Sequence, residues 1–127
     1  MNETTGKIIG AAIEVHKALG PGLLESAYQR CLARELTVRI PFVRHLPLPV
    51  IYKGEQIDCS YCIDFLVEDV VIETKAVAAI DPIHEAQLLT YMKIGQWELG
   101  LLINFNVAVL SRGVRRLILS APSAPLR

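Results

Sequence analysis

The sequence contains no apolar run long enough to cross a bilayer. Its longest apolar stretches, LGLLINF and FVRHLPLPVIY, fall far short of the roughly 20 residues that a spanning helix needs. The N-terminus also lacks a basic stretch followed by an apolar region, which is the pattern of a secretion signal. We therefore expect no membrane association, and the cytoplasm is the default location.

Cysteine is scarce, and its number is odd. Three cysteines in a chain without a secretion signal argue against a disulfide framework. Cys59 and Cys62 form a CxxC pair, but no second such pair or histidine pair follows at a spacing typical of zinc sites. In a strand these two positions point to opposite faces, so we do not expect them to share a metal ion.

Neither charge sign is in excess. Thirteen Lys and Arg balance thirteen Asp and Glu, so the formal net charge is zero. Because nucleic-acid binders usually carry a basic excess, this balance counts against a nuclease. Arginines nevertheless recur over 30–39 and 112–116, while acids collect around 64–73. One small neutral domain makes few phosphate contacts, so a nucleic-acid role favours a homo-oligomer or a partner subunit.

Helical and strand patterns alternate along the chain, and 127 residues correspond to one domain. Asp81-Pro82 predicts a helix start, and Gly95 its end. The order helix, helix, three strands, helix, strand, strand predicts an α/β fold, with a mixed sheet and a central hairpin flanked by helices. We assign residues 1–120 to a single domain and 121–127 to a C-terminal tail. The expected helices are 4–19, 23–39 and 81–94, and the strands include an irregular or edge strand from 41, WELGLLINF and VRRLIL.

Two carboxylates are brought together by the segment YCIDFLVEDVVIETKA, which we interpret as a hairpin. If residues 68–69 form a two-residue turn, the antiparallel register places Asp64 opposite Glu73. Facing anions repel each other unless a cation or a proton lies between them. Lys75 projects from the same face as Glu73. Two acids beside an ammonium group are typical of metal-assisted phosphodiester hydrolysis.

Two alternatives to this interpretation stay open. The charges could form an ordinary stripe on a solvated face, although both strands are too apolar for that to be favoured. Glu-Asp also lacks the Asn-Gly or Asp-Gly signal of a tight turn, and a loop one residue longer would place the acids on opposite faces.

Three short motifs resemble those of the GxxExxY family, a branch of the PD-(D/E)XK nuclease superfamily. They are GLLESAY at 22–28, Asp64 followed by Glu73-Thr74-Lys75, and QLLTY at 87–91, which is similar to the QxxxY motif of the exonuclease-like branch. The resemblance extends from about Thr5 to Leu119. Each motif alone is weak, but the three occur in order on independently predicted elements. The resemblance implies a restriction-endonuclease-like core.

The resemblance implies a metal-dependent nuclease that hydrolyses phosphodiester bonds, with DNA as the expected substrate. Asp64, Glu73 and the backbone carbonyl of Thr74 would bind Mg²⁺, with Mn²⁺ as the alternative ion, because hard oxygen ligands suit both. Glu25 would be a further carboxylate ligand; its alternative role is that of a first-turn acid favoured by the helix dipole. Lys75 would orient the attacking water or stabilise charge on the phosphate.

Four further residues are candidates for binding substrate or supporting the site. Tyr28 lies one turn after Glu25 and would hydrogen-bond a carboxylate, or else belong to the core. Gln87 and Tyr91 share a helix face and would bind a metal-bound water or a phosphate, with a core role open for Tyr91. His84, one turn before Gln87, is a second-tier candidate, because a histidine near a helix start is commonly on the surface.

Two other functional classes remain open. A nucleic-acid-binding or assembly module that kept the fold but lost turnover is favoured by the zero net charge. A protein-interaction subunit is favoured by the hydrophobic content of 52%, which is high enough to include an interface. The intact set of Asp64, Glu73 and Lys75 favours the nuclease over both.

Overall fold

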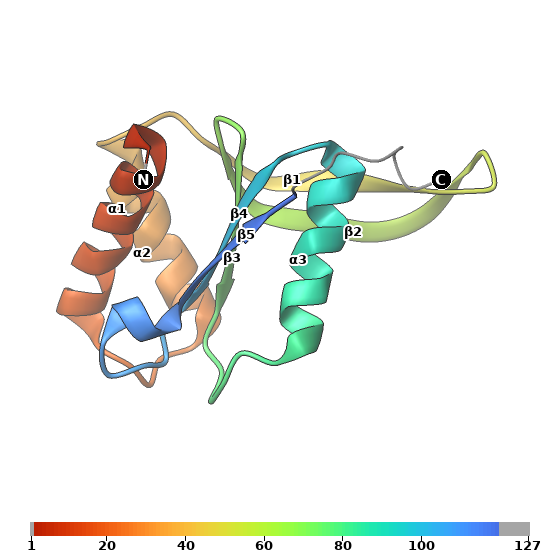
Figure 1. Cartoon of the computed structure of the whole chain (residues 1–127). Coiled ribbons are helices and arrows are strands. Elements are labelled where there is room, and N and C mark those ends of the chain that lie inside the picture. Colours follow the sequence, from red (N-terminus) through yellow and green to blue (C-terminus); the bar gives the residue numbers. More distant parts are fainter. Residues whose placement is uncertain (1, 120–127) are drawn as a thin grey trace.

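A computed structural model describes residues 2–119, apart from the side chains of residues 58–60 (Figure 1). The tail expected at 121–127 and the side chain of Cys59 therefore lie outside the described residues. No helix in the described part of the chain is long and apolar enough to cross a membrane.

The elements follow the predicted order, with one short 3₁₀ turn, η1, in addition. The α/β class predicted from the sequence is therefore confirmed. The elements are α1 (Glu3–Leu19), α2 (Glu25–Thr37), β1 (Val43–Tyr52), β2 (Glu55–Val67), β3 (Val70–Lys75), α3 (Pro82–Gly95), β4 (Leu99–Asn104), η1 (Leu110–Gly113) and β5 (Val114–Ile118).

The five strands form one mixed sheet in the order β1-β2-β3-β4-β5. Only β3 and β4 are parallel, and α3 makes the crossover connection that a parallel pair requires. Helices α1 and α2 cover one face of the sheet and α3 covers the other (Figure 1). Because both faces are covered, the central strands are apolar almost throughout.

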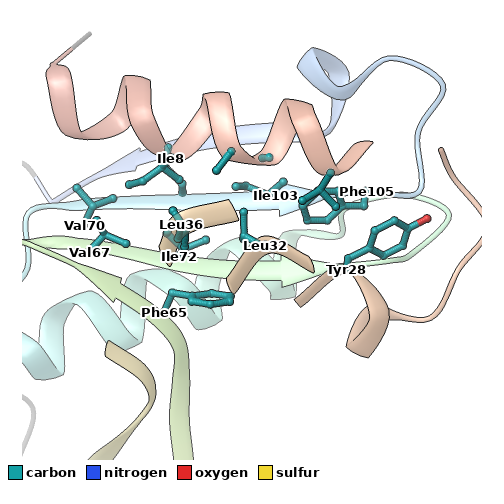
Figure 2. Packing of buried hydrophobic residues seen from close by; sticks show 14 of the residues in the cluster. Ile8, Tyr28, Leu32, Leu36, Phe65, Val67, Val70, Ile72, Ile103 and Phe105 are labelled. Atoms are coloured by element: carbon teal, nitrogen blue, oxygen red, sulfur yellow. The ribbon is translucent and has the colours of Figure 1, made fainter. Parts of the chain in front are cut away.

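Two clusters of buried side chains fill the two layers between helices and sheet. The larger joins α1 and α2 to the sheet through residues such as Ile8, Leu32, Phe65 and Ile72 (Figure 2). The smaller lies under α3 and includes Leu88 and other side chains of α3 and the sheet. Each buried side chain of this size contributes about 1.5–3 kcal/mol of transfer free energy, so the two layers fix the sheet rigidly.

Two helix boundaries differ from those expected, whereas β1 agrees with the irregular or edge strand expected from residue 41, because it lies at the edge of the sheet and its pairing with β2 shifts register between Leu48 and Val50. Helix α2 starts at Glu25, not at residue 23. Helix α3 includes Gly95 and is ended by Gln96, which takes the left-handed conformation at φ 61°. Gly95 is required for packing, because a Cβ atom there would lie 2.0 Å from the Trp97 ring.

The hairpin between β2 and β3 has the predicted two-residue turn. Val67 pairs with Val70, so residues 68–69 form the whole connection. Glu68 adopts a left-handed conformation with φ 51°, which Asn or Gly would adopt with less strain. The hydroxyl of Thr4 donates a hydrogen bond to the Glu68 carboxylate and so links the turn to α1. The register predicted from the two-residue turn is therefore confirmed.

Candidate active site

The strands β2 and β3 stop pairing through their backbones just where the two acids occur. The ladder ends at the pair Phe65 and Ile72. One residue further, the Asp64 backbone N–H donates to Glu73 Oε2 at 2.7 Å. The backbone N–H and the hydroxyl of Thr74 both donate to Asp64 Oδ2, at 2.8 and 2.9 Å. The two carboxylates thus replace the missing ladder bonds and are fixed beside each other.

The Glu73 carboxyl is in an environment that opposes its ionisation. Its residue is only 7% exposed, and this burial, followed by the charge of Asp64, raises its pKa to about 8. The hydrogen bond from the Asp64 N–H and the charge of Lys75 lower the pKa, but they do not offset the rise. Among the described residues, Lys75 makes no direct ion pair with either carboxylate. At neutral pH the pair therefore carries a proton in place of a cation.

The backbone carbonyl of Thr74 is directed toward the same edge as the two acids. In a strand, the N–H and C=O groups of one residue point to the same neighbouring strand. The Thr74 N–H points to Asp64 on β2, whereas the Lys75 carbonyl accepts from the Phe105 N–H on the β4 side at 2.9 Å. The Thr74 carbonyl therefore faces the gap where β2 and β3 separate.

Glu73 and Lys75 project from the face of the sheet that α3 covers. Val71, which shares their face, packs in the cluster with Leu88 and Tyr91 of α3. The site thus lies at the edge of this layer, with the sheet as its floor and α3 as a wall.

Glu25 is the first residue of α2 and reaches the acids from the other helical layer. Burial and then the charge of Asp64 raise the pKa of Glu25, while Lys75 and His84 lower it. These interactions place the Glu25 carboxylate within electrostatic range of Asp64, Lys75 and His84. Gln29, one turn on, donates to Glu25 Oε2 at 3.2 Å and orients it.

The structure does not bring the Tyr28 hydroxyl to the carboxylates. Its oxygen donates to the Gly20 carbonyl at 2.6 Å and accepts from the Leu23 N–H at 3.1 Å. The ring is fully buried and stacks on Phe105 with centroids 4.8 Å apart (Figure 2). Tyr28 thus has the core role left open above, and it holds the loop that presents Glu25.

The three candidate residues of α3, His84, Gln87 and Tyr91, all line one cavity. Burial, followed by the charge of Glu73, raises the pKa of Tyr91, so its phenol lies near the carboxylate pair. His84 Nδ1 accepts from the Asp81 N–H at 3.0 Å in a capping box, which leaves Nε2 as the donor of the neutral ring.

Two asparagines that the sequence interpretation missed connect the loops around the site. Asn104 is 2% exposed; its Oδ1 accepts from the N–H groups of Val77 and Asn106, and its Nδ2 donates to the Val77 carbonyl. Asn106 Oδ1 accepts from the Gly22 N–H at 3.0 Å. The sequence signal that could have identified them is the segment INFN at 103–106, where two amide side chains occur at the end of a buried strand.

The oxygen ligands offered by Asp64, Glu73 and the Thr74 carbonyl fit a hard cation that keeps part of its water shell. No group of three or more His, Cys, Asp or Glu side chains gathers closely enough to hold a metal ion within residues 2–119 whose side chains are described. Two carboxylates and a carbonyl are nevertheless the protein ligands that Mg²⁺ commonly takes, since it retains several waters. The proton held by Glu73 is the charge that such an ion would replace.

Comparison with known families gives one result. A family model for the PD-(D/E)XK nuclease superfamily matches residues 2–117, whereas no curated protein and no solved structure matches significantly. The matched region includes all three helices and every strand of the sheet except the last residue of β5. The protein therefore belongs to the PD-(D/E)XK nuclease superfamily.

Proposed function

We propose that this protein is a nuclease that hydrolyses phosphodiester bonds in DNA with the help of Mg²⁺, or Mn²⁺ in its place. Nucleases of this superfamily typically use divalent metals. The observation that carries the proposal is the fixed pair of Asp64 and Glu73: the Asp64 N–H donates to Glu73 Oε2 at 2.7 Å, and Glu73 is only 7% exposed. Burial and then the charge of Asp64 raise the pKa of Glu73 to about 8, and a bound cation would relieve both effects.

The proposed roles follow from the positions of the side chains. Asp64, Glu73 and the Thr74 carbonyl would hold the ion, with Glu25 as a further carboxylate acting directly or through water. When bound, the ion would acidify a water molecule and neutralise charge on the phosphate. Lys75, on the same face as Glu73, would orient that water and stabilise negative charge on the phosphate oxygens.

The assignment to the GxxExxY branch is also part of the proposal. Its motif has a physical explanation in this chain: Gly22 takes a φ of 103°, and Tyr28 closes the loop that presents Glu25. We further propose a single domain over residues 1–120, a cytoplasmic location, and either a homo-oligomer or a partner subunit that adds phosphate contacts.

Cleavage assays with matched variants test the proposal. Linear, circular and single-stranded DNA are incubated with the protein while Mg²⁺ or Mn²⁺ is titrated. Asp64→Asn is expected to lower cleavage by about 10³-fold or more, since metal stabilisation is worth several kcal/mol. Lys75→Ala is expected to lower it by about 10²–10³-fold. Asp69→Asn, in the exposed turn of the same hairpin, and Lys17→Ala, exposed on α1, are the controls.

Metal binding is measured separately from cleavage. At 100 times its dissociation constant, Mg²⁺ is expected to stabilise the parent protein by about 2.7 kcal/mol, and Asp64→Asn is expected to lose most of this gain. Full cleavage by Asp64→Asn would reject the assignment of the site. Stabilisation by metal and salt-dependent DNA binding without cleavage would instead favour the inactive binding module, which agrees with the zero net charge.

A further inference from the structure

A cavity of about 520 Å³ lies between the β1–β2 hairpin and α3. The β1–β2 hairpin extends past α3 as a long arm (Figure 1). Strand residues line one side of the cavity and residues of α3 the other. Its volume is within the range of sites that hold small organic ligands. Its lining comes from β1 (Val50, Ile51), β2 (Tyr61) and α3 (Ile83, His84, Gln87, Thr90, Tyr91, Ile94).

The cavity borders the layer into which Glu73 projects. Tyr91 lines the cavity and packs in the same buried cluster as Val71, which shares a sheet face with Glu73. Burial, followed by the charge of Glu73, raises the pKa of the Tyr91 phenol. His84 lines the cavity as well and interacts electrostatically with Glu25. A group bound in the cavity is therefore adjacent to whatever the carboxylates bind.

The chemistry of the lining favours a flat, uncharged ligand with polar edges. The rings of Tyr61 and Tyr91 are tilted, with centroids 6.4 Å apart, and aliphatic side chains complete the walls. Among the residues whose side chains are described, the polar lining groups are amide, hydroxyl and imidazole groups, and none is a carboxylate, lysine or arginine. Such a lining does not suit a phosphate, but it suits an aromatic ring that stacks and forms hydrogen bonds at its edge.

We propose that this cavity binds a nucleobase of the substrate strand, next to the phosphate held at Asp64 and Glu73. The proposal rests on the proposed nuclease function and narrows its substrate. In a duplex the bases are stacked and paired inside, so a base reaches a side pocket only after it leaves the stack. The preferred substrate is therefore a single strand or a frayed end, not an intact duplex.

The test scans one abasic residue through a fluorescein-labelled single-stranded DNA oligonucleotide. Binding is followed by anisotropy with Mg²⁺ in the Lys75→Ala background, and kcat/KM is followed with Lys75 intact. At one position the missing base is expected to weaken binding by about 5- to 150-fold. Tyr61→Ala is expected to cause a similar loss with the complete strand and to abolish the effect of the missing base.

Tyr52→Ala is the matched control. Tyr52 is an exposed tyrosine on the same hairpin, 58% exposed against 47% for Tyr61, but it does not line the cavity. This variant is expected to retain the abasic effect and the preference for single strands. An equal abasic effect in Tyr52→Ala and Tyr61→Ala would overturn the proposal. Tighter binding and faster cleavage of a blunt duplex than of a single strand would overturn it as well.

The outcomes separate this inference from the nuclease assignment. Cleavage without any position-dependent abasic effect overturns the base pocket and leaves the nuclease intact. An abasic effect on binding that requires Tyr61, without cleavage of any substrate, supports the pocket and rejects the nuclease. Light scattering that shows a dimer, dissociated by Tyr61→Ala but not by Tyr52→Ala, assigns the cavity to a second copy and overturns the proposal.

Discussion

Substitution of Glu73 by glutamine is expected to stabilise the metal-free protein above neutral pH. The pKa of Glu73 is about 8 in the folded protein, against an ordinary value of 4.5. Between these two values the folded state holds a proton that the unfolded state has released, so the free energy of unfolding falls as pH rises. Glu73→Gln keeps the shape of the side chain and removes this titration.

The size of the effect follows from the pKa difference. One pKa unit corresponds to about 1.36 kcal/mol, so the full change between pH 4 and pH 9 is on the order of 4–5 kcal/mol. This is a large part of the about 5–15 kcal/mol that stabilises a typical domain. Glu73→Gln is expected to match the parent near pH 5 and to exceed it by several kcal/mol at pH 9.

Urea unfolding in EDTA, followed by the fluorescence of the single tryptophan, measures this difference from pH 5 to pH 9. Glu98→Gln, which removes an exposed carboxylate, is the control and is expected to follow the parent profile. A parent-minus-variant difference that stays constant with pH, or that rises, would refute the reasoning. In the presence of Mg²⁺ the free energy of unfolding of the parent protein should fall less steeply with pH, because the bound ion takes the place of the proton on Glu73.

Three other substitutions test the packing around the site. Tyr28→Phe removes a hydroxyl that bonds two backbone groups, so we expect a loss of about 1–3 kcal/mol in thermal or urea unfolding and lower cleavage. Asn104→Ala removes the partner of the Val77 N–H and the closer of the two donors to its carbonyl, and is expected to cost about 1–3 kcal/mol, with faster amide exchange in the loop after β3. Gly95→Ala is expected to lower the free energy of unfolding by about 1–3 kcal/mol, because the clash with Trp97 outweighs the better helix propensity of Ala. Urea unfolding measures this loss. Unchanged stability together with unchanged Trp97 fluorescence emission would contradict the prediction.

The hairpin register was predictable because a two-residue turn leaves only one way to bury both apolar strands. The turn formed although Glu68 is a poor residue for a left-handed φ, since the burial of Val67 and Val70 outweighs local strain. The two acids were then brought together by the period of the strand alone. Local pattern and tertiary packing pointed to the same structure at this place.

The position of Glu25 was not predictable from local pattern. It depends on contacts such as that between Gly22 and Asn106, which are 84 residues apart in the sequence. The role of Tyr28 was equally undetermined, because a spacing of three residues places it beside Glu25 without deciding which way its hydroxyl points. The resemblance to a nuclease family suggested that Glu25 belongs to the site. Only the three-dimensional packing shows where the Tyr28 hydroxyl points.

The amide network of Asn104 and Asn106 has a consequence for when hydrolysis becomes feasible. Through it, the loop before α2 and the loop after β3 both depend on residues that are synthesised after the β2–β3 hairpin and α3. A nascent chain that has reached only Lys75 already contains all the proposed metal ligands, yet it lacks the amides that bring Glu25 to the others. Strand breakage by the proposed nuclease would therefore begin only after residues 104–106 have been synthesised and have folded against these loops, which protects nearby nucleic acid from chains that end before them.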